Sequence, residues 1–142
     1  GMVMMKKLLN TSMIYFALAI AAGVFYREFT KMSGYAGETM LRFVHAHLFA
    51  LGMLLFLVLA LFCRQEGSLA EDKTFRQFFL LYNISLPFMA CMMLARGALQ
   101  VQGAVLSRAA DAAVSGIAGI SHILLTVSLA LLFKALKKNC VR

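Results

Sequence analysis

Three histidines carry the side chains best suited to chemistry in this sequence, and all three lie in apolar stretches. His45 and His47 are two residues apart, and His122 lies in a later stretch. Neutral imidazoles from two helices can hold a haem iron or another metal ion inside a helical bundle. The sequence therefore suggests a metal site formed by these histidines, with haem b as the first candidate cofactor and copper or zinc as the second.

Other residues near the histidines would complete a haem site. Arg42 and Arg96 are expected near the outer membrane surface, where haem propionates would need cationic partners. Gly119 would leave room for a flat cofactor beside His122. The two arginines are equally explained as interfacial anchors or as partners of nearby glutamates. The chain has no Cys-x-x-Cys-His sequence, which excludes covalent haem attachment.

The spacing of the histidines argues against one simple shared pocket. Each residue of a helix advances by about 100°, so His45 and His47 point to nearly opposite sides. From the rise per residue, these two lie about 6–9 Å below the outer end of their helix and His122 about 15–17 Å below its own. We expect His122 to face the bundle interior as part of a stripe of small and polar residues, Ser115, Gly119 and Thr126.

Hydrogen bonding between helices is the alternative role of the histidines. A membrane-buried imidazole can bond to a hydroxyl or a backbone carbonyl on a neighbouring helix without any metal. Under this alternative the chain is a structural or assembly protein. The sequence contains no paired intramembrane carboxylates, no Gly-x-Ser-x-Gly, no His-Glu-x-x-His and no phosphate-binding glycine loop. We therefore expect no enzymatic activity under either alternative.

The composition places these residues in a membrane protein. Hydrophobic residues make up 62% of the chain and charged residues 14%, whereas soluble domains have about 45–50% and about 25%. Runs of about 20 mostly apolar residues, the length of a membrane-spanning helix, occur at residues 8–25, 41–63, 75–94 and 112–133. Because the connections are short, we expect one all-α domain over residues 2–142, an up-and-down bundle of four transmembrane helices in a lipid bilayer.

The net charge of +8 indicates membrane topology rather than nucleic-acid binding, because the basic residues gather at the ends of the apolar stretches. With the N-terminus in the cytoplasm, nine of the fourteen Lys and Arg residues become cytoplasmic: Lys6, Lys7, Arg64, Lys73, Arg76, Lys134, Lys137, Lys138 and Arg142. This bias predicts a multi-pass protein of the cell membrane with both termini inside.

Small residues and one proline predict how the helices meet. Ala112, Gly116 and Gly119 form a face on which a helix of another copy can pack closely, which suggests a homo-oligomer. Asn83 and Pro87 share a face of the third apolar stretch, and the proline ring clashes with the carbonyl of Asn83. We expect a kink there, with the freed carbonyl bonded to a neighbouring hydroxyl or to water.

Three separated segments resemble a bacterial family of small four-span membrane proteins known as domain of unknown function 2871. They are residues 25–31, residues 45–53 with their His-Ala-His and Leu-Gly-Met sequences, and residues 115–123. The resemblance extends over nearly the whole chain. It implies a protein of the bacterial inner membrane of about this size, and it carries no activity, ligand or catalytic residue.

A second likeness concerns His45 and His47 followed by Gly52, which is similar to a helix of the catalytic subunit of haem-copper oxidases. In those enzymes a His-x-His pair serves two metal centres on opposite sides of one helix. The resemblance implies haem binding only, because this chain lacks the other histidines that oxygen reduction needs.

Overall fold

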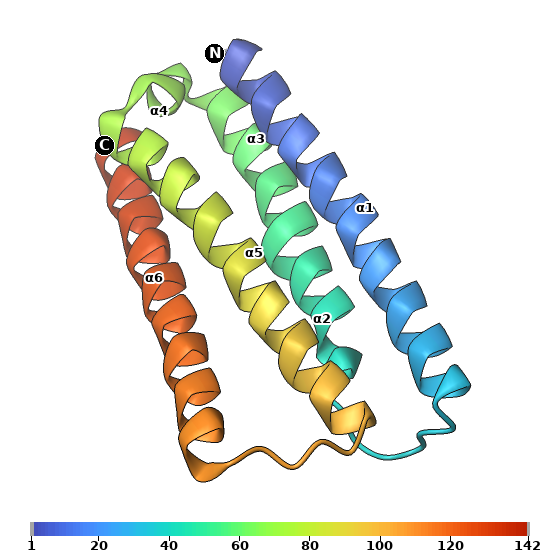
Figure 1. Cartoon of the computed structure of the whole chain (residues 1–142). Helices are drawn as coiled ribbons and strands as arrows, with labels where there is room; N and C mark the ends of the chain where they lie inside the picture. The colour runs from blue at the N-terminus through green and yellow to red at the C-terminus, as the bar shows by residue number, and fades with distance from the viewer. Residues whose placement is uncertain (1, 142) are drawn as a thin grey trace.

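The computed structural model describes residues 2–141 as a series of helices joined by short connections (Figure 1). Their bounds are α1 Met2–Met32, α2 Leu41–His47, η1 Leu48–Leu54, α3 Leu55–Gln65, α4 Gly67–Glu71, α5 Lys73–Val101 and α6 Arg108–Cys140. Because η1 is a π-helix that joins α2 to α3 without a break, these three segments form one rod. No strand occurs among residues 2–141.

Four helices are long and apolar enough to cross a membrane, which confirms the predicted all-α, four-span architecture. They are α1, the rod of residues 41–65, α5 and α6, with 31, 25, 29 and 33 residues. The three longest extend beyond the predicted apolar runs, because charged and polar residues near their ends interrupt those runs. A helix of about 30 residues is about 45 Å long, so its ends reach through the headgroup layers on both sides of a hydrocarbon core of about 30 Å.

The helices run up and down, so both termini lie at the same end of the molecule (Figure 1). We call this end, which holds the start of α1, the short helix α4 and the end of α6, the terminal end. The opposite end, which holds the connections at residues 33–40 and 102–107, is the loop end. These names carry no assumption about which side faces the cytoplasm.

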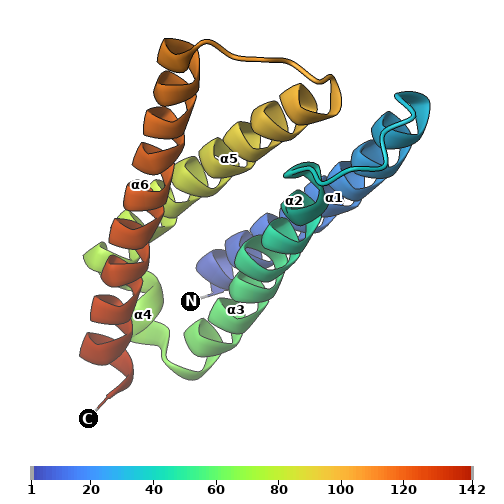
Figure 2. The same ribbon diagram turned by 90° about the horizontal axis from the view of Figure 1, so that it is seen from below.

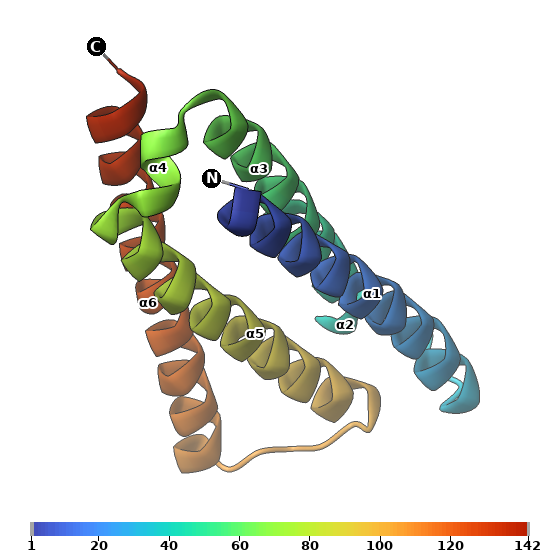
Figure 3. The same ribbon diagram turned by 90° about the horizontal axis from the view of Figure 1, so that it is seen from above.

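The helices form a row rather than a closed ring. α1 packs along the rod of α2, η1 and α3, whereas α5 packs against α2, η1 and α6. α6 packs against α5 and α4. Views from below and from above show α5 and α6 close together near α4 and well separated at the loop end, where residues 102–107 bridge the gap (Figures 2 and 3). α6 therefore lies at one end of the row, and α1 lies at the other.

Aromatic side chains fill the space between α3 and α5. Phe56 is fully buried, stacks on Tyr15 with 5.8 Å between ring centres, and meets Tyr82 edge-on at 5.7 Å. Phe78 lies 5.2 Å from Tyr82 and 6.3 Å from Phe56. Large rings of this kind hold two helices together at a separation that small aliphatic side chains would leave empty. This cluster is one part of the hydrophobic core, which includes buried residues of every long helix.

The predicted inward face of α6 is wrong. The side chains that α6 buries are Ser121, Leu125, Ser128, Leu132 and Ala135. The predicted stripe is exposed on the opposite side of the helix: Ser115, Gly119, His122 and Thr126. Two of the buried residues are serines whose hydroxyls donate to carbonyls of α6 itself, to Ala118 at 2.6 Å and to Leu125 at 2.7 Å. Polarity therefore does not mark the face that is turned inward.

Candidate functional site

Polar side chains inside the membrane-spanning helices gather around the π-helical segment η1. Wider turns of a π-helix leave backbone carbonyls without their usual partners, and such segments are frequent at functional sites. Here the hydroxyl of Ser12 on α1 donates to the carbonyl of Met53 at 2.7 Å, and the hydroxyl of Tyr82 on α5 donates to that of Leu51 at 2.6 Å. Side chains from two neighbouring helices thus satisfy the carbonyls of η1.

Tyr15 joins α1 to α5 one turn further along α1. Its hydroxyl donates to Oδ1 of Asn83 at 2.7 Å, and the amide of Asn83 donates to the carbonyl of Phe79 at 2.7 Å. The ring of Tyr15 lies directly on Gly52 of η1, where an added Cβ would come within 2.6 Å of the Cβ of Tyr15. Gly52 is therefore the position that lets α1 approach the rod closely.

This network holds α1, the rod and α5 in position. Its members carry hydroxyl, amide and carbonyl groups, and the bonds between them use these groups. The sequence pointed to the carbonyl of Asn83 as the group that would need a hydroxyl. The structure instead places the hydroxyl of Tyr15 on the side chain of Asn83. Ser12 and Tyr15 were missed, although their polar groups within an apolar run were the signal that could have found them.

His45 faces α1 and leaves one ring nitrogen without a partner. Its Cγ would lie 3.7 Å from a Cβ added to Gly23, and its ring meets Phe49 edge-on with 6.4 Å between centres. The Nδ1 atom is buried and has no hydrogen-bond partner among residues 2–141. A ligand of a metal through Nε2 normally donates its Nδ1–H to a carbonyl or carboxylate. His45 lacks that support.

His47 and His122 do have that support, each within its own helix. The Nδ1 of His47 lies 2.7 Å from the carbonyl of Phe43, and that of His122 lies 2.9 Å from the carbonyl of Ala118. A carbonyl only accepts, so both Nδ1 atoms carry a proton, and in a neutral imidazole the Nε2 atom then presents a lone pair. These bonds stay inside one helix, unlike the bonds between helices that the structural alternative predicts.

The structure does not bring the three histidines together. His45 is directed at α1, whereas His122 is exposed on α6, which packs against α5 and α4. Across residues 2–141, no three His, Cys, Asp or Glu side chains are close enough to hold a metal ion. A metal or haem site built from one copy of the chain therefore has no structural support.

The two arginines assigned to a haem site have carboxylate partners. Arg42 lies 3.9 Å from Glu38 one turn away, and both side chains are largely exposed. Arg96 donates to Asp111 at 2.6 Å and to the hydroxyl of Ser115 at 2.9 Å. Arg96 thus ties α5 to the first turns of α6 at the loop end, where the two helices are far apart. The guanidinium of Arg96 therefore links two helices.

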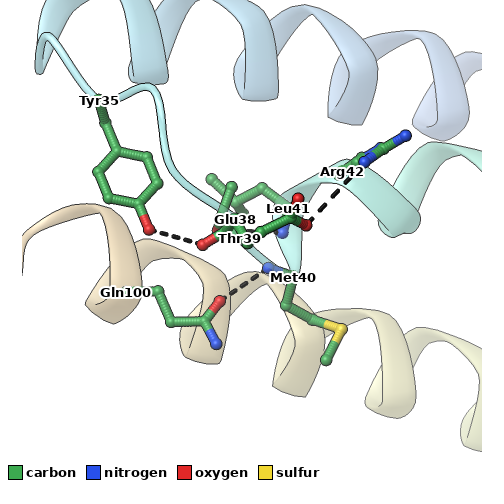
Figure 4. A network of polar contacts seen from close by, with 7 residues as sticks. All are labelled: Tyr35, Glu38, Thr39, Met40, Leu41, Arg42 and Gln100. Carbon is green, nitrogen blue, oxygen red and sulfur yellow. Dashed lines mark hydrogen bonds and ion pairs between the residues drawn. The ribbon is translucent and has the colours of Figure 1, made fainter.

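The connection between α1 and α2 is held against the end of α5 (Figure 4). The backbone N–H of Met40 donates to Oε1 of Gln100 at 2.7 Å, and the hydroxyl of Thr39 donates to the carbonyl of Gly97 at 2.9 Å. A Cβ added to Gly97 would lie 2.6 Å from the backbone nitrogen of Leu41. Glycine is therefore required for the chain to pass this close to α5.

One long surface remains uncovered, on the first half of α6. Residues 108–120 include no buried residue. A Cβ added to Gly116 or Gly119 would meet no heavy atom within 4 Å. Ala112 and Ser115 are exposed on this part of the helix, where the hydroxyl of Ser115 accepts a hydrogen bond from Arg96 of α5, and His122 follows Gly119 by three residues. We call these five residues the open face of α6.

Comparison with known families identifies one match. The family described as Protein of unknown function (DUF2871) matches residues 5–139, so the chain belongs to this family. No curated protein and no solved structure matches the chain. The second likeness, to haem-copper oxidases, has no support in these comparisons.

Proposed function

We propose that this member of the family is a non-enzymatic protein of the bacterial inner membrane that assembles with a second copy of itself through the open face of α6. The observation that supports this proposal is the lack of any buried residue from 108 to 120, in contrast with the five residues that the second half of α6 buries. In the first part of α6, Arg96 of α5 bonds to Asp111 and Ser115, and the exposed small residues beside these bonds are suited to pairing.

The spacing on the open face fits a helix pair. Ala112 and Gly116 are four residues apart, as are Ser115 and Gly119, so two small-xxx-small repeats lie side by side. In lipid the association of helices depends on close van der Waals packing, because lipid tails are as apolar as leucine side chains. Glycine without neighbours within 4 Å allows another backbone to approach closely.

A second copy is the occupant that this geometry favours. Two copies inserted in the same orientation are related by a two-fold axis along the membrane normal, so equivalent residues of the two α6 helices meet at the same depth. A face of small residues is complementary to itself.

Fluorescence energy transfer between labelled copies in lipid vesicles tests the assembly. The double substitution Gly116→Leu, Gly119→Leu adds two large side chains to the open face and should abolish energy transfer. Ala113→Leu is the matched control, because Ala113 is exposed on the same helix but lies outside the face. Equal energy transfer in the double variant and the control would refute pairing through α6, as would a monomeric wild-type protein.

Binding of haem or a metal ion between two copies is a second candidate function, favoured by the state of His122. Its Nδ1–H bond to Ala118 leaves the Nε2 lone pair available, and the side chain lies on the pairing face one turn beyond Gly119. Pairing would bring two His122 imidazoles to the same depth, which is the two-histidine ligation that a b-type haem needs. Such a site would serve electron transfer or sensing.

An absorption spectrum with metal analysis on gently purified protein tests this second candidate. A Soret band that is lost in His122→Ala and retained in His45→Ala would support the site between copies. The reverse pattern would move the ligand to His45, and a colourless, metal-free protein would contradict haem and metal binding altogether. Neither of these last two results would affect the pairing of α6, so the two candidate functions are tested separately.

Both termini are assigned to the cytoplasm in this proposal. Eight Lys and Arg residues of the described chain lie at the terminal end, compared with five towards the loop end. Segments adjacent to membrane helices carry more basic residues on the cytoplasmic side. The distribution of charge therefore supports the orientation with the terminal end inside.

A further inference from the structure

A groove of about 650 Å³ opens at the terminal end between α1, α4 and α5. This volume lies within the range of about 300–1,000 Å³ that is usual for small-molecule pockets. Its charged lining consists of Lys7 from α1, Arg76 from α5 and Glu71 from α4. Two cations and one carboxylate leave the groove with a net positive charge, and α6 contributes no residue to it.

The two cations of the groove are not neutralised by ion pairs. Among residues 2–141, neither Lys7 nor Arg76 has a carboxylate oxygen within 4.0 Å. The Nζ of Lys7 lies 4.7 Å from the centre of the Phe79 ring, which also lines the groove. This cation–π contact holds the ammonium group at the groove. The nearby Asp72 is occupied by Lys138, at 3.0 Å.

The groove becomes apolar away from the terminal end. Phe79, Leu80 and Ile84 follow Arg76 along one face of α5 and line the same groove. Asn83 also lines it, and its side-chain amide is bonded to the hydroxyl of Tyr15 and to the carbonyl of Phe79. From Arg76 to Ile84 the helix rises by about 12 Å. The cations therefore lie at the level where lipid headgroups begin, and the apolar wall lies at the level of the acyl chains. Leu80 and Ile84 are 67% and 53% exposed, so this wall is open to the surrounding lipid.

We propose that this groove binds one anionic phospholipid, with its phosphate between Lys7 and Arg76 and the first part of an acyl chain along Phe79, Leu80 and Ile84. Basic pockets between transmembrane helices recognise anionic headgroups in this way. A zwitterionic lipid would bring its own cation next to the two basic side chains, and soluble phosphate would leave the apolar wall unused. The inference is independent of the proposed pairing, because the open face of α6 is not part of the groove.

Native mass spectrometry of the purified protein tests the inference with phosphatidylglycerol and phosphatidylcholine of identical acyl chains. The wild-type protein should retain one phosphatidylglycerol molecule in preference to phosphatidylcholine. The double variant Lys7→Gln, Arg76→Gln should bind phosphatidylglycerol about 30-fold more weakly, since about 1 kcal/mol is expected for each basic residue near an anionic lipid. Lys134→Gln, Lys137→Gln is the matched control, because it removes the same charge from α6 at the same end.

A second variant separates lipid binding from capture of any phosphate. Ile84→Trp fills the apolar part of the groove and keeps both cations, so it should also weaken phosphatidylglycerol binding. If the charge variant does not fold, Ile84→Trp alone tests whether the groove binds the lipid. Unchanged affinity in Ile84→Trp and in a folded charge variant would overturn the inference. Equally strong binding of glycerol 3-phosphate, which has no acyl chains, would also overturn it and identify a soluble phosphate ligand instead.

Discussion

The side chain of Tyr15 connects α1 to η1, α3 and α5. Its ring packs on Gly52 of η1 and stacks on Phe56 of α3, and its hydroxyl reaches Asn83 of α5. A single side chain of α1 thus contacts the rod and the next helix. Inside a membrane-spanning bundle, a polar side chain that loses its partner is costly.

The substitution Tyr15→Phe should lower the free energy of unfolding by about 0.6 kcal/mol, the average for hydrogen bonds between membrane helices, and by at most about 1.7 kcal/mol. The ring contacts stay in place, so the loss reports the bond to Asn83 alone. Titration with a denaturing detergent, followed by circular dichroism, measures the change. Tyr26→Phe is the control, since this hydroxyl on the same helix bonds to no residue from 2 to 141. Equal stability of Tyr15→Phe and the control would show that the bond contributes nothing.

Among the histidines, residue spacing correctly placed His45 and His47 on different sides of their helix, but it could not show what each side meets. His45 meets Gly23 of α1, whereas the Nδ1 of His47 bonds to its own helix. Sequence spacing determines directions around one helix axis. The neighbour found in each direction depends on the packing of the other helices.

At the scale of the elements, Asp72 joins the start of α5 to the end of α6. Its Oδ1 accepts the backbone N–H of Phe75 at 3.1 Å, which caps α5. Its Oδ2 accepts from the amide of Asn139 and lies near the ammonium of Lys138, each at 3.0 Å. The hydrogen bond from Asn139, assisted by Lys138 and the N–H of Phe75, lowers the pKa of Asp72 to about 2 against the opposing effect of burial.

The substitution Asp72→Ala should therefore destabilise the protein by about 0.5–2 kcal/mol, the cost of losing a helix cap. The sign of the pH dependence follows from the lowered pKa: the carboxylate stabilises the fold fully above about pH 4, and this contribution is lost as the pH falls towards about 2. Thermal unfolding in a neutral detergent from pH 7 to pH 2 should show that the difference between wild type and variant shrinks over this window. Glu71→Ala, at the neighbouring acid, is the control. A difference that stays constant with pH would contradict the assignment to Asp72.

At the scale of the whole molecule, the orientation proposed from the distribution of charge predicts which connections can be labelled from outside. In a background without the three native cysteines, Ala104→Cys at the loop end should react with a membrane-impermeant maleimide on intact spheroplasts. Ser68→Cys at the terminal end should react only after the membrane is opened. Both positions are exposed in the structure. The opposite labelling pattern would place the termini outside, and failure of either position to react in opened membranes would show that the site is covered.

The sequence by itself determined the class of the protein, its four spans and its family. Long apolar runs are intrinsic to the chain because each transmembrane helix must satisfy its backbone hydrogen bonds internally over a fixed hydrocarbon thickness. The accumulation of basic residues at the helix ends was also readable without a structure. Both signals depend on the contact of single helices with the bilayer.

Only the tertiary structure decided which faces of the helices meet. Lipid and protein interior are equally apolar, so hydrophobicity gives the length of a membrane helix but does not distinguish its buried face from its lipid-facing one. For this reason the sequence could not show that α6 buries Ser121 and Ser128 and leaves Gly119 and His122 exposed. For the same reason the partners of Asn83 and Arg96 and the groove beside Lys7 were invisible in the sequence, since each depends on helices that are distant along the chain and adjacent in the fold.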